Sequence, residues 1–261
     1  MLRLPRPVSC AAALSMLLVG CGGSLSSLPG GAPPTPKLAG SLTVFAAASL
    51  TEALSDEKAR LSTAYPGLSV TYSFAGSQQL VAQIQAGAPA DVVATADEDD
   101  MQKLMTAKLV ETSRVFARNR LEIVVAPGNP KGVKGLADLA RSDLKVVLGD
   151  PSVPAGNYGR RALDKQGVTV HPASLELNVK AELQKVESGE ADAGIVYATD
   201  VKSAGARATG VAIPADQNVE ATYPVAVVKG TNSHGLAQAF VDQLATGMGQ
   251  EALRARGFLA P

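Results

Sequence analysis

The chain of 261 residues is long enough for one large or two medium-sized α/β domains. Its 46% hydrophobic and 18% charged residues exclude a disordered or membrane-spanning protein. The 24 basic and 24 acidic residues give a net charge of zero, which argues against a nucleic-acid partner.

The N-terminal segment predicts export. Arg3 and Arg6 precede a short apolar core, residues 8–20, which is too short for a transmembrane helix and is typical of a signal peptide over residues 1–20. This segment ends in Leu18-Val-Gly-Cys21, which resembles the lipobox of bacterial lipoproteins. We therefore expect Cys21 to carry the lipid that anchors the protein to the extracytoplasmic face of the cell membrane. The alternative is an ordinary cleaved signal in which the cysteine is incidental.

The segment after Cys21 predicts a flexible tether. Residues 21–40 are rich in glycine, serine and proline, and such a composition cannot bury enough apolar surface to fold. The other cysteine, Cys10, lies in the predicted signal peptide, so the mature body contains no free thiol. An exported body without disulfides depends on its hydrophobic core for stability.

From residue 41 onward, apolar strands alternate with amphipathic helices, which predicts βαβ units and a parallel sheet. Strands are expected at residues 42–47, 68–74, 91–96, 121–126, 145–149, 194–197 and 223–228. Helices are expected at residues 49–64, 77–86, 101–107, 157–165, 178–188, 235–245 and 250–256. This order predicts two domains joined by two crossover strands. Residues 41–118 with 222–261 form the first domain, and residues 119–221 form the second.

Two serines, Ser49 and Ser77, each lie where a predicted strand ends and a helix begins. The start of a helix has unpaired N–H groups and the positive end of the helix dipole, so each serine could bind an anion there. For Ser49 a second role is equally open, because Ser49 and Glu52 form the pattern of a capping box. Ser77 has Leu80 at the corresponding position and does not show that pattern. The two roles of Ser49 need not exclude each other.

Three further positions could supply donors. Like the two serines, Ala155 and Tyr197 lie at or just after strand ends, where open α/β sheets bind their ligands. Ala155 has the first N–H after Pro154, at a strand-to-helix turn. Val179 follows the expected helix cap Asn178, so its N–H is unpaired. Tyr197 ends a strand, where its hydroxyl could close a polar pocket and where its ring could equally serve packing.

The sequence gives little support for catalysis. His171 and His234 are the only histidines, and neither has a partner at metal-ligand spacing. The chain contains no Gly-x-Ser-x-Gly elbow and no Walker A motif. We therefore expect no enzymatic activity, no cofactor and no direct protein–metal ligand.

Taken together, the chain resembles the molybdate-binding proteins that serve ABC transporters, which have the type II periplasmic-binding-protein fold. The resemblance covers residues 42–259 in the expected order. Its motifs are Val44-Phe-Ala-Ala-Ala-Ser-Leu50, Ser73-Phe-Ala-Gly-Ser77, Gln85-Ala-Gly-Ala-Pro-Ala-Asp91, Gly149-Asp-Pro-Ser-Val-Pro-Ala-Gly156, Gly194-Ile-Val-Tyr197 and Tyr223-Pro-Val-Ala-Val227.

The resemblance implies a role for each candidate residue. Ser49 and Ser77 would donate hydrogen bonds from hydroxyl and backbone, Ala155 and Val179 from backbone N–H groups, and Tyr197 from its hydroxyl. The ligand would be molybdate or tungstate, held as an oxyanion between the two domains. Closure of the domains around it would present the loaded protein to an ABC permease. We expect the carrier to be a monomer.

Hydrogen-bond chemistry agrees with this ligand. Molybdate and tungstate only accept hydrogen bonds, so a site of donors suits them and leaves the hydroxyl of a protonated phosphate unpaired. Sulfate is acceptor-only as well, so a carrier of sulfate or another tetrahedral oxyanion is the first alternative. An enzyme or a sensor built on this fold is the second, and it should show an acid–base pair, a cofactor lysine or an output domain.

Overall fold

The computed structural model describes residues 38–261, so the predictions for the signal peptide, for Cys21 and for most of the tether lie outside the described residues. Leu38 is buried in the main core and Gly40 begins the first strand. The folded body therefore starts ahead of the predicted boundary at residue 41. Within residues 38–261, none of the helices is both long enough and apolar enough to span a membrane.

The strands form one mixed sheet and one small parallel pair. They are β1 (Gly40–Ala47), β2 (Leu68–Ala75), β3 (Val92–Ala94), β4 (Arg114–Val125), β5 (Val147–Gly149), β6 (Ser174–Glu176), β7 (Ala193–Tyr197), β8 (Thr209–Ala212) and β9 (Glu220–Val227). The main sheet has the order β2-β1-β3-β9-β4-β7, with β8 also paired to β4, and β5 pairs with β6. β1 runs parallel to β2 and β3, whereas β9 runs antiparallel to β3 and β4.

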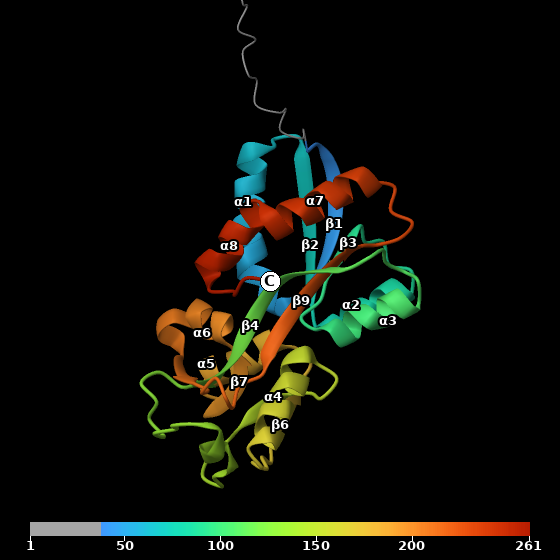
Figure 1. The fold of residues 1–261 in the computed structure, drawn as a ribbon. Coiled ribbons are helices and arrows are strands. Elements are labelled where there is room, and N and C mark those ends of the chain that lie inside the picture. Colours follow the sequence, from blue (N-terminus) through green and yellow to red (C-terminus); the bar gives the residue numbers. More distant parts are fainter. Residues whose placement is uncertain (1–37) are drawn as a thin grey trace, which may run out of the picture. The chain divides into compact units, whose positions relative to one another are not determined.

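The helices follow the strands in the alternation that the sequence predicts (Figure 1). They are α1 (Thr51–Ala64), α2 (Ser77–Gln85), α3 (Glu98–Thr106), α4 (Pro154–Lys165), α5 (Val179–Glu187), α6 (Ala198–Ala204), α7 (His234–Thr246) and α8 (Met248–Arg256), with short 3-10 helices η1 (Ala48–Leu50), η2 (Leu136–Ala140) and η3 (Gly205–Arg207). The predicted α/β fold class is confirmed.

Strands β4 and β9 are each shared by two groups of elements. Residues 114–120 of β4 pair with β9, residues 121–125 pair with β7, and residues 122–125 also pair with β8. In β9, residues 220–225 pair with β4 and residues 225–227 pair with β3. Figure 1 shows the two strands running together from the group with α1, α7 and α8 to the group with α4, α5 and α6. This is the connectivity expected of two crossover strands; the division into two domains stays a prediction.

The first half of β4 was not predicted from the sequence. It contains three arginines that are exposed or half-buried, so it lacks the continuous apolar run of residues 121–125. Arg114 and Arg118 reach Asp242 and Glu220 at 3.1 and 3.3 Å. Pairing with β9 supplies the backbone hydrogen bonds that make this segment a strand. The short elements β6, α6 and β8 were also not predicted.

Two helices begin three residues earlier than predicted. Helix α4 starts at Pro154, because a proline has no N–H to leave unpaired at the first helical position. Helix α3 starts at Glu98, because the Asp97 carboxylate accepts the N–H of Asp100 at 3.0 Å. Gly156 lies in the first turn of α4, where the sequence would allow a guest to approach a backbone without a side chain. Instead, a side chain there would collide with the carbonyls of residues 149–150, so glycine allows α4 to pack onto the end of β5.

One buried acid on α1 makes stability depend on pH. Glu57 lies fully buried on the apolar face of α1, where it accepts a hydrogen bond from the Tyr72 hydroxyl at 3.0 Å. Burial raises the pKa of Glu57 to about 8, although the hydrogen bond from Tyr72 opposes the shift. The folded protein therefore keeps a proton that the unfolded chain releases above its ordinary pKa of 4.5. Stability is lost as pH rises from that value towards 8.

We expect the Glu57→Gln variant to lose this pH dependence. Glutamine keeps an acceptor for Tyr72 and cannot ionise. The free energy of unfolding, measured in urea at pH 5 and pH 8, should fall less for the variant than for the wild type. Between pH 5 and pH 8 the wild type should lose on the order of 2–4 kcal/mol more unfolding free energy than the variant, since each pKa unit corresponds to about 1.4 kcal/mol. Equal falls in both proteins would contradict the buried-acid assignment.

Candidate functional site

The two serines lie at the ends of neighbouring parallel strands. β1 leads into η1, which contains Ser49, and β2 leads through Gly76 into α2, whose first residue is Ser77. Both serines are buried. The N–H groups of a first helical turn have no partner inside the helix, so each serine presents a backbone donor beside its hydroxyl.

The structure corrects the capping role of Ser49. Ser49 lies within the 3-10 turn, and α1 begins after it with Leu50 as its cap residue and no side-chain cap bond. Glu52 does not complete a capping box, because its carboxylate pairs with the Lys180 ammonium at 2.7 Å. The Ser49 hydroxyl is thus not used as a helix cap.

Two other helix starts lie at the same place. Ala155 is in the first turn of α4, directly after Pro154. Val179 is the first residue of α5, and the Asn178 side chain accepts the N–H of Ala181 at 2.9 Å, which confirms the predicted cap. Because that cap bond goes to a later N–H, the backbone donor of Val179 stays available.

Tyr197 ends strand β7 with its side chain fully buried. Its hydroxyl has no hydrogen-bond partner among the described residues. Burial raises the pKa of this tyrosine well above its ordinary value, so the hydroxyl keeps its proton and can donate it. An unpaired buried hydroxyl is costly and calls for a ligand or another function.

All five predicted residues line one small cavity of about 10 Å³. Each is 1–4% exposed, and the cavity also touches Ala96 and the cap residue Asn178. This volume is at the lower limit of what a single water molecule needs, so the walls of the cavity lie close together. Its described lining includes no lysine, arginine, aspartate or glutamate. Larger cavities exist, such as one of about 310 Å³ beside α4, but only Ala155 of the five reaches it.

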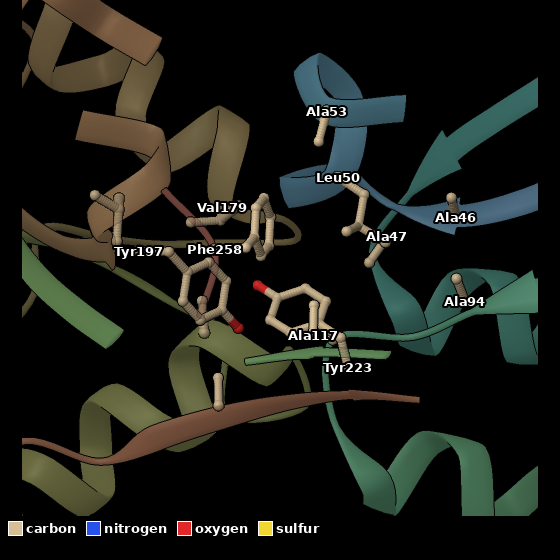
Figure 2. Close-up of a cluster of buried hydrophobic side chains, with 14 of the residues drawn as sticks. Ala46, Ala47, Leu50, Ala53, Ala94, Ala117, Val179, Tyr197, Tyr223 and Phe258 are labelled. Atoms are coloured by element: carbon tan, nitrogen blue, oxygen red, sulfur yellow. The ribbon is translucent and has the colours of Figure 1, made fainter. Parts of the chain in front are cut away.

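The acceptor side of each serine hydroxyl is already occupied. The Tyr223 hydroxyl donates to Ser49 Oγ at 3.1 Å, and the N–H of Ala96 donates to Ser77 Oγ at 3.0 Å. A hydroxyl that accepts from the protein retains its own proton for a guest. Figure 2 shows Tyr197 and Tyr223 as neighbours, and their ring centroids are 5.8 Å apart. Each serine hydroxyl in the cavity wall therefore keeps a proton that it can donate.

Sequence reasoning missed Tyr223 and Ala96 as supports of the two serines. Tyr223 lies in an apolar strand and in one of the family motifs, but neither gives it a role, and its distance of 174 residues from Ser49 hides the contact. The sequence offers one indication of this role: Tyr223 brings a polar hydroxyl into a strand whose other residues are mostly buried. Ala96 acts through its backbone, which leaves no signal in the residue type.

Acidic groups lie close behind the cavity. Asp97 follows Ala96, and burial, with the nearby charge of Asp100, raises its pKa to about 7. Asp200 is fully buried, and its carboxylate accepts the N–H of Tyr197 at 3.2 Å. Burial raises the pKa of Asp200, while the Lys180 ammonium at 2.8 Å opposes that rise.

The chain is similar in sequence to known bacterial solute-binding proteins. The family model described as "Bacterial extracellular solute-binding protein" matches residues 42–259. The molybdate-binding protein ModA of Mycobacterium tuberculosis is 40% identical over 246 residues, covering 94% of this chain and 93% of the relative.

Two solved structures share the fold. The periplasmic molybdate-binding protein of Azotobacter vinelandii has a TM-score of 0.72 at 22% identity and covers 84% of this chain and 99% of its own. The sulfate-binding protein SubI of Mycobacterium tuberculosis has a TM-score of 0.73 at 22% identity. Its match covers 84% of this chain and 86% of the SubI chain. One neighbour is named for molybdate and the other for sulfate, and both match this chain equally well. The fold alone therefore does not distinguish a molybdate-binding protein from a sulfate-binding one.

Proposed function

The chain belongs to the bacterial extracellular solute-binding protein family, and we propose that it is the molybdate-binding component of an ABC transporter. The relative of 40% identity that carries this function in its name matches nearly the whole chain. The predicted type II solute-binding fold agrees with the folds of the molybdate- and sulfate-binding neighbours.

One observation carries the proposal for the site. The buried Tyr197 hydroxyl has no partner in the described chain and lies in a cavity with two serine hydroxyls and the starts of three helices. Each hydrogen bond to a charged group contributes roughly 1.5–3 kcal/mol. Several of them together offset an association cost of roughly 4–15 kcal/mol. A dianion that only accepts hydrogen bonds can therefore bind without a lysine or arginine in the cavity.

We extend the proposal to the ligand residues, the domain closure and the membrane anchor. Ser49, Ser77, Ala155, Val179 and Tyr197 bind the oxyanion, with tungstate as a second ligand of the same shape. Residues 41–118 with 222–261 close on residues 119–221 around it, and an ABC permease receives the closed form. Cys21 anchors the carrier to the outer face of the cell membrane. The protein works as a carrier rather than an enzyme.

Sulfate transport is the second candidate function. It is favoured by the structural likeness to a sulfate-binding protein and by the shared acceptor-only chemistry of the two anions. Pocket size must then separate the two ligands, because hydrogen-bond type does not.

Thermal unfolding with different oxyanions tests the proposal. Molybdate and tungstate at equal concentration should raise the melting temperature, because a ligand that binds only the folded state stabilises it. Sulfate should raise it much less, and phosphate not at all. Equal stabilisation by sulfate would favour the second candidate, and no stabilisation by molybdate would refute the first.

Tyr223→Phe should weaken molybdate binding by about three- to tenfold, the equivalent of one ordinary hydrogen bond. The variant keeps the ring contacts with Phe116 and Phe258 but no longer fixes the direction of the Ser49 hydroxyl. Isothermal titration measures the change. Tyr72→Phe is the matched control, since it removes a hydroxyl that bonds Glu57 outside the cavity. An unchanged affinity in Tyr223→Phe would show that Ser49 needs no such support.

A further inference from the structure

One lysine connects three of the segments that line the cavity. The Lys180 ammonium lies 2.9 and 2.7 Å from the two carboxylate oxygens of Glu52, and 2.8 Å from Oδ1 of Asp200. Glu52 is in the first turn of α1, three residues after Ser49. Lys180 directly follows Val179.

The third segment is the end of β7. The other carboxylate oxygen of Asp200 accepts the N–H of Tyr197 at 3.2 Å, which ties the ion pair to the cavity tyrosine. The ion bridge Glu52–Lys180–Asp200 thus joins the three segments that contain Ser49, Val179 and Tyr197. Its three side chains stand outside the cavity lining, so they support the proposed ligands without replacing them.

The burial of the bridge makes its charges interact strongly. The Asp200 side chain is fully buried, and those of Lys180 and Glu52 are 24% and 32% exposed. Burial alone would lower the pKa of Lys180, but the charge of Asp200 and the hydrogen bonds to Asp200 and Glu52 raise it instead. The ammonium stays charged, and a partly buried pair is screened less by salt than a surface pair.

The bridge crosses between the two predicted domains. Glu52 belongs to residues 41–118, whereas Lys180 and Asp200 belong to residues 119–221. A neighbouring ion pair on the same helix behaves differently: Asp56, one turn after Glu52, binds Arg256 of α8 at 2.6 and 2.9 Å within the first predicted domain. The Asp56–Arg256 pair is therefore a matched control for the Glu52–Lys180 pair.

We propose that Lys180 is a positioning residue that holds the two sides of the cavity together and slows the release of the bound oxyanion. This inference rests on the proposed function, because it concerns the same cavity. Removing the Glu52 charge breaks only the link between the two sides. The pair of Lys180 with the buried Asp200 remains, so the fold keeps its internal charge balance.

The test compares Glu52→Gln with Asp56→Asn. Both variants remove one carboxylate from α1, and their release of radiolabelled molybdate is followed after an excess of unlabelled molybdate is added. Glu52→Gln should release the ligand about three- to tenfold faster than the wild type. Asp56→Asn should release it at the wild-type rate. The acceleration should also disappear in a Lys180→Gln background, because the two residues act through one contact.

The other possible results would contradict the role proposed for Lys180 or the proposed function. Faster association with an unchanged release rate in Glu52→Gln would mean that Glu52 only repels the anion, and would overturn the inference. Equal acceleration in Asp56→Asn would overturn it as well. Additive effects in the double variant would show that Glu52 acts without Lys180. A wild type that does not bind molybdate would refute the proposed function itself, whatever the variants do.

Discussion

Tyr197→Phe should bind molybdate about 10- to 100-fold more weakly than the wild type, while the unliganded protein loses no stability. The hydroxyl is buried without a hydrogen-bond partner among the described residues, so its removal breaks no hydrogen bond within the described part of the protein. A buried hydroxyl that lacks a partner costs about 1–3 kcal/mol, so the unliganded variant should be as stable as the wild type or more stable. The affinity falls because one hydrogen bond to a charged ligand is lost.

Two measurements on the same variant separate a binding role from a structural role. Isothermal titration gives the affinity, and urea unfolding without ligand gives the stability. The phenylalanine ring preserves the edge contact with Tyr223, so packing stays constant. A loss of stability together with affinity would assign the hydroxyl to the fold. An unchanged affinity would remove Tyr197 from the site.

The second large effect is expected for Ser49→Ala combined with Ser77→Ala. Both hydroxyls accept from the protein and have a proton free for the guest, so the double variant loses two charge-assisted donors. The affinity for molybdate should fall by roughly 100-fold or more, and each single variant should lie between the wild type and the double variant. Titration with molybdate measures this.

Stability is the necessary control for the serine variants. Ser77→Ala leaves the buried N–H of Ala96 without its acceptor, which costs about 1–3 kcal/mol. Circular dichroism must therefore show that the double variant is folded at the titration temperature. Ser55→Ala with Ser62→Ala is the matched double variant, because both serines are exposed on α1 and bond only to its backbone. Full affinity in the Ser49 and Ser77 variant would contradict their assignment as ligands.

The sequence predicted the place of four candidate residues from strand ends, because open α/β sheets bind ligands beyond the carboxyl ends of their strands. Those four are Ser49, Ser77, Ala155 and Tyr197, whereas Val179 was placed only by the cap residue before it. That all five share one site was implied by the family resemblance. Ser77 and Val179 were placed correctly at helix starts, since cap residues and apolar periodicity mark them. The α/β class followed from the alternation of apolar runs with amphipathic segments.

The contacts that support the site could not be predicted in the same way. Glu52 fits a capping box in local sequence, yet it pairs with Lys180, which lies 128 residues away. The tertiary ion pair outweighs the local pattern because Lys180 is held beside buried Asp200. Tyr223 supports Ser49 from a distant strand for the same reason. Such pairs depend on how the sheet is assembled, and no spacing along the chain encodes them.

The most direct test of the account is the position of molybdenum in a crystal of the protein grown with molybdate. Anomalous diffraction at the molybdenum edge identifies the metal without assumptions about its surroundings. The account predicts one strong peak per chain, in the cavity lined by Ser49, Ser77, Ala155, Val179 and Tyr197, with the ligand oxygens within hydrogen-bond distance of their donors. A peak elsewhere on the molecule, or a cavity that stays without molybdenum at saturating concentration, would contradict it.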